Sequence, residues 1–307
     1  MSILQVNNLS KNYGFVQALQ NVSFEVPKGS VFGILGPNGS GKTTLLGIVM
    51  DIIKPTSGSY LWNGQPGSNE QRKKIGTLLE TPNFYHYLSG EKNLQIAAAI
   101  KERGKEDIPA VLEKVNLTQR KHSKFSTYSL GMKQRLAIAS TLLGSPDIMV
   151  FDEPTNGLDP AGIAEIRQLI KELNRQGKTI IMASHILDEV EKVCTHVAII
   201  QKGVLKTYGT VEEVLSGSAD ENAIMTAEIE LAADNLSTLE VILKEMPGIL
   251  HVELHGATLS IKCNSDISPA AINQFCFNKG IVLSQLVLKK KSLEKRFLEI
   301  TGNQSDR

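Results

Sequence analysis

The residues with the clearest chemistry in this sequence form one glycine-rich stretch that matches the phosphate-loop pattern G-x-x-x-x-G-K-[ST] in full. The stretch runs Gly36, Pro37, Asn38, Gly39, Ser40, Gly41, Lys42, Thr43, Thr44. Its glycines permit backbone angles that a Cβ would forbid, so successive N–H groups can turn toward one anion. Lys42 would reach the β- and γ-phosphates as a point charge, and Thr43 would offer its hydroxyl to Mg²⁺. The pattern therefore predicts a site for the phosphates of a nucleotide.

A second group of chemical residues follows two apolar runs. The first run, residues 148–151, is followed directly by Asp152 and Glu153. The second run, residues 179–183, is followed two positions later by His185. Asp152 would hold Mg²⁺ directly or through water, and Glu153 is placed to polarise an attacking water as a general base. His185 could hydrogen-bond the γ-phosphate or that water. The plainer alternative is a strand end with two solvated carboxylates and a structural histidine, but the phosphate loop upstream favours nucleotide hydrolysis.

Three further residues carry weaker signals when each is taken alone. Tyr13 could stack on a purine ring, although a surface tyrosine beside a turn is the ordinary alternative. Ser129 fits the N-cap position of a helix, and Gly131 lets a backbone approach closely. A helix N-terminus with these two residues could bind an anion, although most such helix starts are only caps.

These residues need elements that bring them together, and the hydrophobic pattern predicts alternating strands and helices. Residues 31–35 form an apolar run typical of a buried strand, and a helical pattern begins after the phosphate loop. Further short apolar runs alternate with helical patterns, which favours a doubly wound α/β sheet with ligands at the carboxyl ends of its strands. Residues 89–143 have helical spacing and predict an all-helical insertion between strands.

A polar stretch of small residues, 216–220, predicts a domain boundary. We therefore divide the chain into residues 1–216 and residues 217–307. The second part shows the pattern β-α-β-β-α-β, which suggests a small ferredoxin-like α+β domain, and no motif in it carries chemistry. Its last helix, residues 293–300, has an apolar stripe that needs burial against its own domain or a partner.

The composition sets limits on partners and location. The chain has 307 residues and a formal net charge of +1, which gives no electrostatic case for nucleic acid or an anionic membrane as the main partner. Its three cysteines have no metal-ligand spacing and suggest reduced cytosolic thiols. The beginning shows no signal-peptide pattern, and no apolar run approaches the ~20 residues that span a bilayer. We therefore expect any membrane role to work through another chain.

Taken together, residues 3–216 resemble the ATP-binding subunit of an ABC transporter. The resemblance rests on motifs in the family's order: the phosphate loop, residues 128–135 at the signature position, Asp152-Glu153, Gly157-Leu158-Asp159 and His185. It implies a P-loop NTPase fold with antiparallel β and helical subdomains, and it implies hydrolysis of ATP with Mg²⁺.

The resemblance also implies roles for individual residues. Tyr13 would stack on adenine, Ser129 and Gly131 would contact the γ-phosphate of ATP held by a second subunit, and Asp159 would couple the two sites. The family works as a head-to-tail pair with two ATPs between phosphate loop and opposing signature. We therefore expect a second ATP-binding subunit, as a homodimer, and a separate integral membrane permease, with the chain cytoplasmic and peripheral on the inner face of the membrane.

Three positions depart from the family's usual pattern. The usual signature is Leu-Ser-Gly-Gly-Gln, whereas here Leu130 replaces the first Gly and Met132 replaces the Gln. Glu80 stands where the family usually has a Gln that contacts Mg²⁺ and water. These departures, and the tail at residues 292–302, are similar to the bacitracin/lantibiotic drug-exporter branch, which implies export of a drug or peptide-like compound.

Other functions stay open on the sequence alone. A soluble ABC ATPase of DNA repair or ribosomes would usually carry long coiled coils, two cassettes, zinc modules or strong basic patches, and none of these is present. The C-terminal domain could instead be regulatory, binding a small ligand or a partner, with the ATPase as a timer. A P-loop kinase would transfer phosphate to a small substrate, but Asp152 and Glu153 beside a signature helix argue against it.

Overall fold

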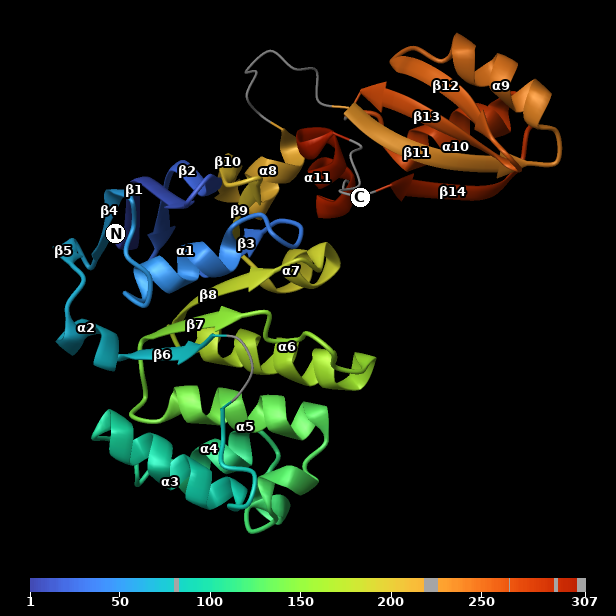
Figure 1. The fold of residues 1–307 in the computed structure, drawn as a ribbon. Helices are drawn as coiled ribbons and strands as arrows, with labels where there is room; N and C mark the ends of the chain where they lie inside the picture. Colours follow the sequence, from blue (N-terminus) through green and yellow to red (C-terminus); the bar gives the residue numbers. More distant parts are fainter. Residues whose placement is uncertain (80–82, 218–225, 265, 290–291, 303–307) are drawn as a thin grey trace. The chain divides into compact units, whose positions relative to one another are not determined.

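The computed structural model describes residues 1–79, 83–217, 226–264, 266–289 and 292–302. The chain forms two compact units, which we describe separately (Figure 1). The first unit comprises residues 1–215 and the segment from residue 293 onward, and the second unit comprises Ser216–Ser292. Among the described residues, no helix is both long enough and apolar enough to cross a bilayer.

The centre of the first unit is a six-stranded sheet in the order β10-β9-β3-β8-β7-β6. Its strands are β3 (Val31–Leu35), β6 (Ile75–Leu78), β7 (Ile148–Asp152), β8 (Thr179–Ser184), β9 (His196–Gln201) and β10 (Val204–Thr210). The strand pairs from β9 to β6 are parallel, and β10 pairs with β9 as an antiparallel hairpin. Helices separate the parallel strands along the chain, which confirms the predicted doubly wound α/β sheet.

A second sheet of the first unit is antiparallel and has the order β2-β1-β4-β5. Its strands are β1 (Ser2–Tyr13), β2 (Val16–Pro27), β4 (Ser57–Trp62) and β5 (Gln65–Pro66). The first two strands are longer than the apolar pattern predicts, because cross-strand pairing continues to the turn between them. Tyr13 therefore ends β1 and pairs with Val16.

The apolar strand runs serve two cores, because successive residues of a strand face opposite sides of the sheet. Phe32 and Ile34 of β3 pack with α1 (Lys42–Val49) and the antiparallel sheet. Val31 and Leu35 pack on the other side, among the remaining helices. Strand β3 is thus buried on both faces, which fixes the start of the phosphate loop that follows it.

The other helices of the first unit contribute buried residues to the second core, apart from the short helix α2 (Asn69–Lys73), which has none. They are α3 (Gly90–Lys101), α4 (Ile108–Lys114), α5 (Leu130–Leu142), α6 (Pro160–Arg175), α7 (Leu187–Val193), α8 (Val211–Ser216) and α11 (Leu293–Thr301), with 3₁₀ turns at Thr118–Arg120 and Phe125–Thr127. Helices α3, α4 and α5 lie together and form the helical insertion that the sequence predicts (Figure 1). Ser89 and Ser129 cap two of them, since each side chain accepts from a backbone N–H three residues on.

The second unit has its own sheet, two helices and a separate core. Its elements are β11 (Thr226–Ala233), α9 (Leu236–Glu245), β12 (Ile249–His255), β13 (Thr258–Asn264), α10 (Pro269–Asn278) and β14 (Leu283–Lys289). They follow the predicted β-α-β-β-α-β order, and the antiparallel sheet runs β12-β13-β11-β14. The ferredoxin-like assignment of this unit stays a prediction.

The last helix belongs to the first unit, which differs from the expected division at residue 216. Leu293 is fully buried in the first unit's core, and Phe297 and Ile300 pack against that core. Periodicity identifies such a stripe but does not say which surface covers it. The second unit is thus an insertion, with chain anchored on the first unit at both of its ends.

Candidate active site

The phosphate loop, Glu153 and His185 lie at the carboxyl ends of neighbouring strands in the six-stranded sheet. Strand β8 lies between β3 and β7, and the three strands are parallel. The phosphate loop follows β3, Glu153 follows β7, and His185 follows β8. Neighbouring strands lie about 4.8 Å apart, so this order brings distant parts of the sequence together at the carboxyl ends of the strands.

The phosphate loop takes a shape that requires glycine. Gly41 has a φ of 108° just before α1, and a Cβ there would lie 2.5 Å from the carbonyl oxygen of Ala18. The N–H of Gly203 donates to the carbonyl oxygen of Ser40 at 3.0 Å, which ties the loop to the β9–β10 hairpin. These contacts hold the loop at the N-terminus of α1, where free N–H groups and the helix dipole favour a phosphate.

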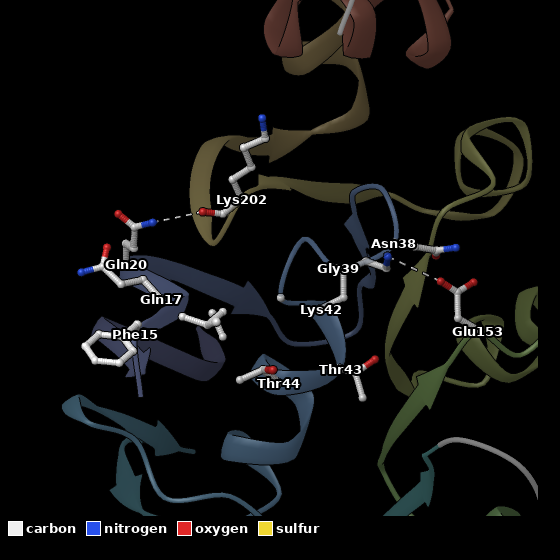
Figure 2. Close-up of a pocket in the computed structure, with 13 residues that line it drawn as sticks. Phe15, Gln17, Gln20, Asn38, Gly39, Lys42, Thr43, Thr44, Glu153 and Lys202 are labelled. Atoms are coloured by element: carbon white, nitrogen blue, oxygen red, sulfur yellow. Dashed lines mark hydrogen bonds and ion pairs between the residues drawn. The ribbon is translucent and has the colours of Figure 1, made fainter. Parts of the chain in front are cut away.

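Lys42 is buried, and its side chain extends toward Glu153 (Figure 2). Its Nζ donates to the carbonyl oxygens of Gly36 at 2.8 Å and Pro37 at 3.1 Å, and it lies 3.6 Å from Oε1 of Glu153. Burial lowers the pKa of Lys42, while the negative charges of Glu153 and Asp152 oppose that shift. The two carboxylates therefore help to keep this buried ammonium group charged at the phosphate loop.

Glu153 links Lys42 to His185. Its Oε2 lies 2.8 Å from Nδ1 of His185, while its Oε1 faces Lys42. Its backbone has a φ of 48°, which is uncommon outside glycine, and its N–H donates to the carbonyl oxygen of Ala183 on β8 at 3.0 Å. Backbone strain of this kind gathers at functional sites, where the surroundings over-determine the conformation. The bond to β8 thus holds the carboxylate beside His185.

Two oxygen donors near the phosphate loop suit Mg²⁺. Asp152 is the buried last residue of β7, and Thr43 is exposed in the first turn of α1. Mg²⁺ prefers oxygen ligands and usually combines one or two carboxylates with waters and substrate phosphates. The described part of the chain holds no group of three or more His, Cys, Asp or Glu side chains that could hold a metal alone. The donors therefore fit an ion shared with phosphates; Glu80, the third expected ligand, lies outside the described residues.

A cavity of about 590 Å³ opens beside the loop. Lys42, Thr43 and Glu153 line one side of it, and Phe15 lies on the opposite side (Figure 2). Tyr13 does not appear among the described lining residues; it is half exposed at the end of β1. The structure thus brings the phosphate-binding and hydrolytic residues together, and it places Phe15, rather than Tyr13, on the wall away from Glu153.

Phe15, Gln20 and Lys202 form part of the cavity wall and match none of the sequence motifs. The Nε2 of Gln20 donates to the carbonyl oxygen of Lys202 at 3.2 Å, and both residues line the cavity (Figure 2). The sequence could have suggested Phe15 as a binding residue, because it is a large aromatic residue that follows a turn glycine, Gly14. It could not have suggested Lys202, because the position of that residue depends on how the β9–β10 hairpin packs against β2.

The signature segment forms the start of α5. Ser129 caps the helix, with its hydroxyl accepting from the N–H of Met132 at 3.3 Å, and the next side chain, Leu130, is 54% exposed. One turn on, Gln134 is buried and its Nε2 donates to the carbonyl oxygen of Pro154 at 2.8 Å. Gln134, which has no predicted role in the sequence, thus links the signature helix to the residue after Glu153.

The signature turn packs against the loop that begins α6. A Cβ on Gly157 would lie 2.9 Å from a methyl group of Leu130, so glycine permits this contact. Asp159 caps α6, because its Oδ1 accepts from the N–H of Gly162 at 3.0 Å. The lining of the cavity, as far as the described residues define it, includes neither Asp159 nor the signature residues Ser129 and Gly131. These three residues therefore do not form the described lining of the cavity beside the phosphate loop.

Comparisons with known proteins agree with this geometry. A family model described as ABC transporter matches residues 19–156. The bacitracin transport ATP-binding protein of Enterococcus faecalis is 32% identical over 98% of this chain and 96% of its own length. The lantibiotic transport ATP-binding protein of Streptococcus pyogenes is 40% identical over 66% of this chain and 88% of its own length. The resemblance to the bacitracin and lantibiotic branch is thereby confirmed.

Solved structures show the same fold for the first unit. The ATP-binding cassette MJ0796, in a dimeric post-hydrolysis state bound to ADP and phosphate, matches with a TM-score of 0.62 and 26% identity. The match covers 68% of this chain and 98% of that chain. A loop for phosphates, two oxygen donors for Mg²⁺ and a carboxylate that can position a water are parts used in the hydrolysis of a nucleoside triphosphate.

Proposed function

Because the chain belongs to the ABC transporter family as an ATP-binding subunit that hydrolyses ATP, we propose that it powers a separate membrane permease. Relatives that cover most of it are named for bacitracin and lantibiotic transport, which supports export of a drug or peptide-like compound. The cavity of the first unit is built for a nucleotide, so selectivity for the exported compound would lie in the permease. The observation that carries the function is the connected row of Lys42, Glu153 and His185.

The three residues of this row would divide the hydrolytic work. Lys42 binds and neutralises the phosphates, Glu153 takes the proton of the attacking water at its carboxylate, and His185 orients that carboxylate or the γ-phosphate. Mg²⁺, held by Thr43 and Asp152, would supply further positive charge at the phosphates. Catalysis is then mainly positioning and electrostatics, which agrees with a site built from strand ends and backbone groups.

We propose that a second, identical copy completes each nucleotide site. Ser129 and Gly131 lie outside the cavity of their own chain, at a helix start suited to an anion. Leu130, beside them, exposes about half of its side chain, which the second copy would cover in the dimer. The solved cassette that this chain resembles is dimeric, which supports the same arrangement here. Asp159, packed near the signature turn, would then lie at the dimer interface.

The permease contact is proposed at a groove of the helical group. Residues 83–86 and three apolar residues of α3 line a hollow of about 430 Å³, together with Asn93. Tyr85, Tyr87 and Ile100 are each more than half exposed at or near it. An amphipathic helix of the permease suits such an apolar groove, and its entry there would bind the chain to the inner face of the membrane.

A soluble ATPase with a regulatory C-terminal domain is the less favoured alternative. The family relatives reported above are named for transport, and they match along 98% and 66% of this chain. The alternative would need the chain to act without a membrane protein, and this requirement decides between the two functions.

The test is a pull-down of the full chain from membranes that contain its native neighbours, with ATPase assayed in the same fraction. We expect a polytopic membrane protein to co-purify and to stimulate hydrolysis. A variant with Tyr85 and Tyr87 replaced by serine tests the groove. It should no longer bind the permease, while its basal ATPase activity should remain. A soluble ATPase with full activity and no membrane partner would overturn the transporter role.

A further inference from the structure

The returning helix α11 is fixed to the first unit by polar as well as apolar contacts. Leu293 is fully buried in the core, and the Nε of Arg296 donates to the carbonyl oxygen of Val214 at 3.0 Å. At the other end of the helix, the Nε2 of Gln201 donates to the carbonyl oxygen of Thr301 at 3.1 Å. The bond between Arg296 and Val214 joins the segments on either side of the inserted second unit. The two segments of the first unit that flank the insertion are thus bonded to each other.

Helix α7 bonds both α11 and the loop between β7 and α6, residues 153–159, which we call the hydrolytic loop. The Oε2 of Glu191 accepts from the N–H of Leu293, the first residue of α11, at 2.7 Å. Two residues earlier, the Oε2 of Glu189 accepts from the hydroxyl of Thr155 at 2.5 Å. Residues two apart in a helix point in nearly opposite directions, about 200° around the axis. Helix α7 therefore bonds α11 with one face and the loop that follows Glu153 with the other.

The hydrogen bond between Glu189 and Thr155 can couple the position of α7 to the position of the loop after Glu153. Glu189 is 5% exposed and Thr155 is 3% exposed, so water cannot replace either partner without a large cost. Thr155 comes two residues after Glu153, and α7 begins two residues after His185. A displacement of α7 would therefore move the loop and both hydrolytic residues rather than break the bond.

We propose that α7 positions the hydrolytic loop through Glu189 and Thr155, and that α11 sets the place of α7 through Glu191. Glu189 and Glu191 are then positioning residues of ATP hydrolysis. The proposal rests on the proposed role of Glu153 as the general base. In this proposal, burial of the apolar stripe of α11 also fixes the position of the Leu293 N–H that bonds Glu191.

We call this path, from Leu293 through Glu191 and Glu189 to Thr155, the relay. The test removes each of its two hydrogen bonds in the full chain. Glu191→Ala removes the acceptor of the Leu293 N–H, and Thr155→Val removes the hydroxyl bonded to Glu189 while keeping the side-chain volume. We expect each to lower kcat about 3- to 10-fold with an unchanged KM for ATP. Glu191→Gln and Thr155→Ser keep the hydrogen-bonding group and should restore kcat, a rescue that a general loss of stability would not show.

Two surface variants serve as matched controls. Lys192→Ala changes the charge on α7, and Glu294→Ala changes the charge in the first turn of α11. Both side chains are exposed, so neither substitution should alter kcat. If Glu191→Ala folds poorly, Glu191→Asp, which shortens the acceptor but keeps its charge, takes its place.

The double variant Glu191→Ala/Thr155→Val separates a relay from two unrelated effects. In a relay, the second substitution adds little, so the double variant should have the kcat of the slower single variant. Multiplied effects, a normal kcat in Glu191→Ala, or an equal loss in the controls would each overturn the proposal. Glu153→Gln is measured beside them: normal hydrolysis in that variant refutes the role of Glu153, whereas an inactive Glu153→Gln with a normal Glu191→Ala refutes only the relay.

Discussion

The Nδ1 atom of His185 lies 2.8 Å from the Oε2 atom of Glu153, although the two residues follow different strands. The other carboxylate oxygen of Glu153 lies 3.6 Å from the ammonium group of Lys42. The glutamate is therefore held between a cation at the phosphate loop and an imidazole at the end of β8. This arrangement orients the carboxylate, and the predictions for the site depend on it.

Glu153→Gln should stop hydrolysis while ATP still binds. The amide keeps the shape of the side chain and can still bond His185, but it cannot accept the proton of the attacking water. We expect kcat to fall by about 100-fold or more, and we expect ATP to hold the subunits as a dimer. Steady-state ATPase assays and size-exclusion chromatography with ATP check this. Rapid turnover in the variant would contradict the role of Glu153 as general base.

Lys42→Ala should weaken ATP binding without unfolding the protein. The substitution removes the charge at the phosphates and also removes an ammonium group whose burial is unfavourable, as its lowered pKa shows. We expect at least a tenfold rise in the Kd for ATP, since a charged hydrogen bond contributes about 1.5–3 kcal/mol. Lys28→Ala, at the exposed turn before β3, is the control that should leave the Kd unchanged. Equal affinities in the two variants would refute the phosphate-loop role.

Gly41→Ala should disrupt the phosphate loop more than an ordinary glycine substitution does. The new Cβ would sit 2.5 Å from the carbonyl oxygen of Ala18, at a φ of 108°. We expect a loss of about 1–3 kcal/mol in the free energy of unfolding and a loss of ATP binding. Gly177→Ala, where φ is 83° and no atom lies within 4 Å of the new Cβ, isolates the cost of the backbone angle alone. Urea unfolding of both variants makes the comparison, and equal losses would show that the contact with Ala18 is unimportant.

Tyr13→Ala and Phe15→Ala should weaken binding of ATP but not of tripolyphosphate. Stacking of an aromatic side chain on a base contributes about 1–3 kcal/mol, and tripolyphosphate has no base. We expect roughly a tenfold effect for Tyr13, which the family resemblance assigns to adenine, and a smaller effect for Phe15, which lines the cavity. Calorimetric titration of both ligands measures the difference. A tripolyphosphate affinity that falls with the ATP affinity would instead indicate damage to the phosphate loop.

Lys101 should make the protein more stable as pH rises above neutrality. Burial, and then the charge of Arg103, lower the pKa of Lys101 to about 8, although its Nζ donates to the carbonyl oxygen of Ser140 at 2.6 Å. Between pH 8 and pH 10.5 the unfolded chain keeps a proton that the folded chain has lost, so the free energy of unfolding increases with pH.

The measurement compares urea unfolding of the native chain and of Lys101→Met at pH 7 and pH 10. We expect the stability of the native chain to rise relative to the variant by about 1–2 kcal/mol, allowing for the partial exposure of the side chain. Other groups that titrate in this range cancel in the comparison. A difference that does not change with pH would show that Lys101 keeps its ordinary pKa.

The sequence alone determined the parts of this protein that depend on neighbouring residues. The phosphate loop, the pair Asp152 and Glu153, and the cap at Ser129 are contiguous patterns, because each needs only a strand end, a turn or a helix start next to it. The strand and helix order follows for the same reason, since hydrophobic periodicity reports which side of an element is buried.

Only the tertiary structure decided which distant segments meet. Three features join residues whose spacing in the sequence does not predict a contact. They are the cavity wall at Lys202, the bond between Gln134 and Pro154, and the packing of α11 in the first unit. An apolar stripe can be buried against any surface of matching shape, and a buried polar atom can be paired with a partner on any such surface. The choice among such surfaces is made by packing of the whole fold, which local pattern cannot describe.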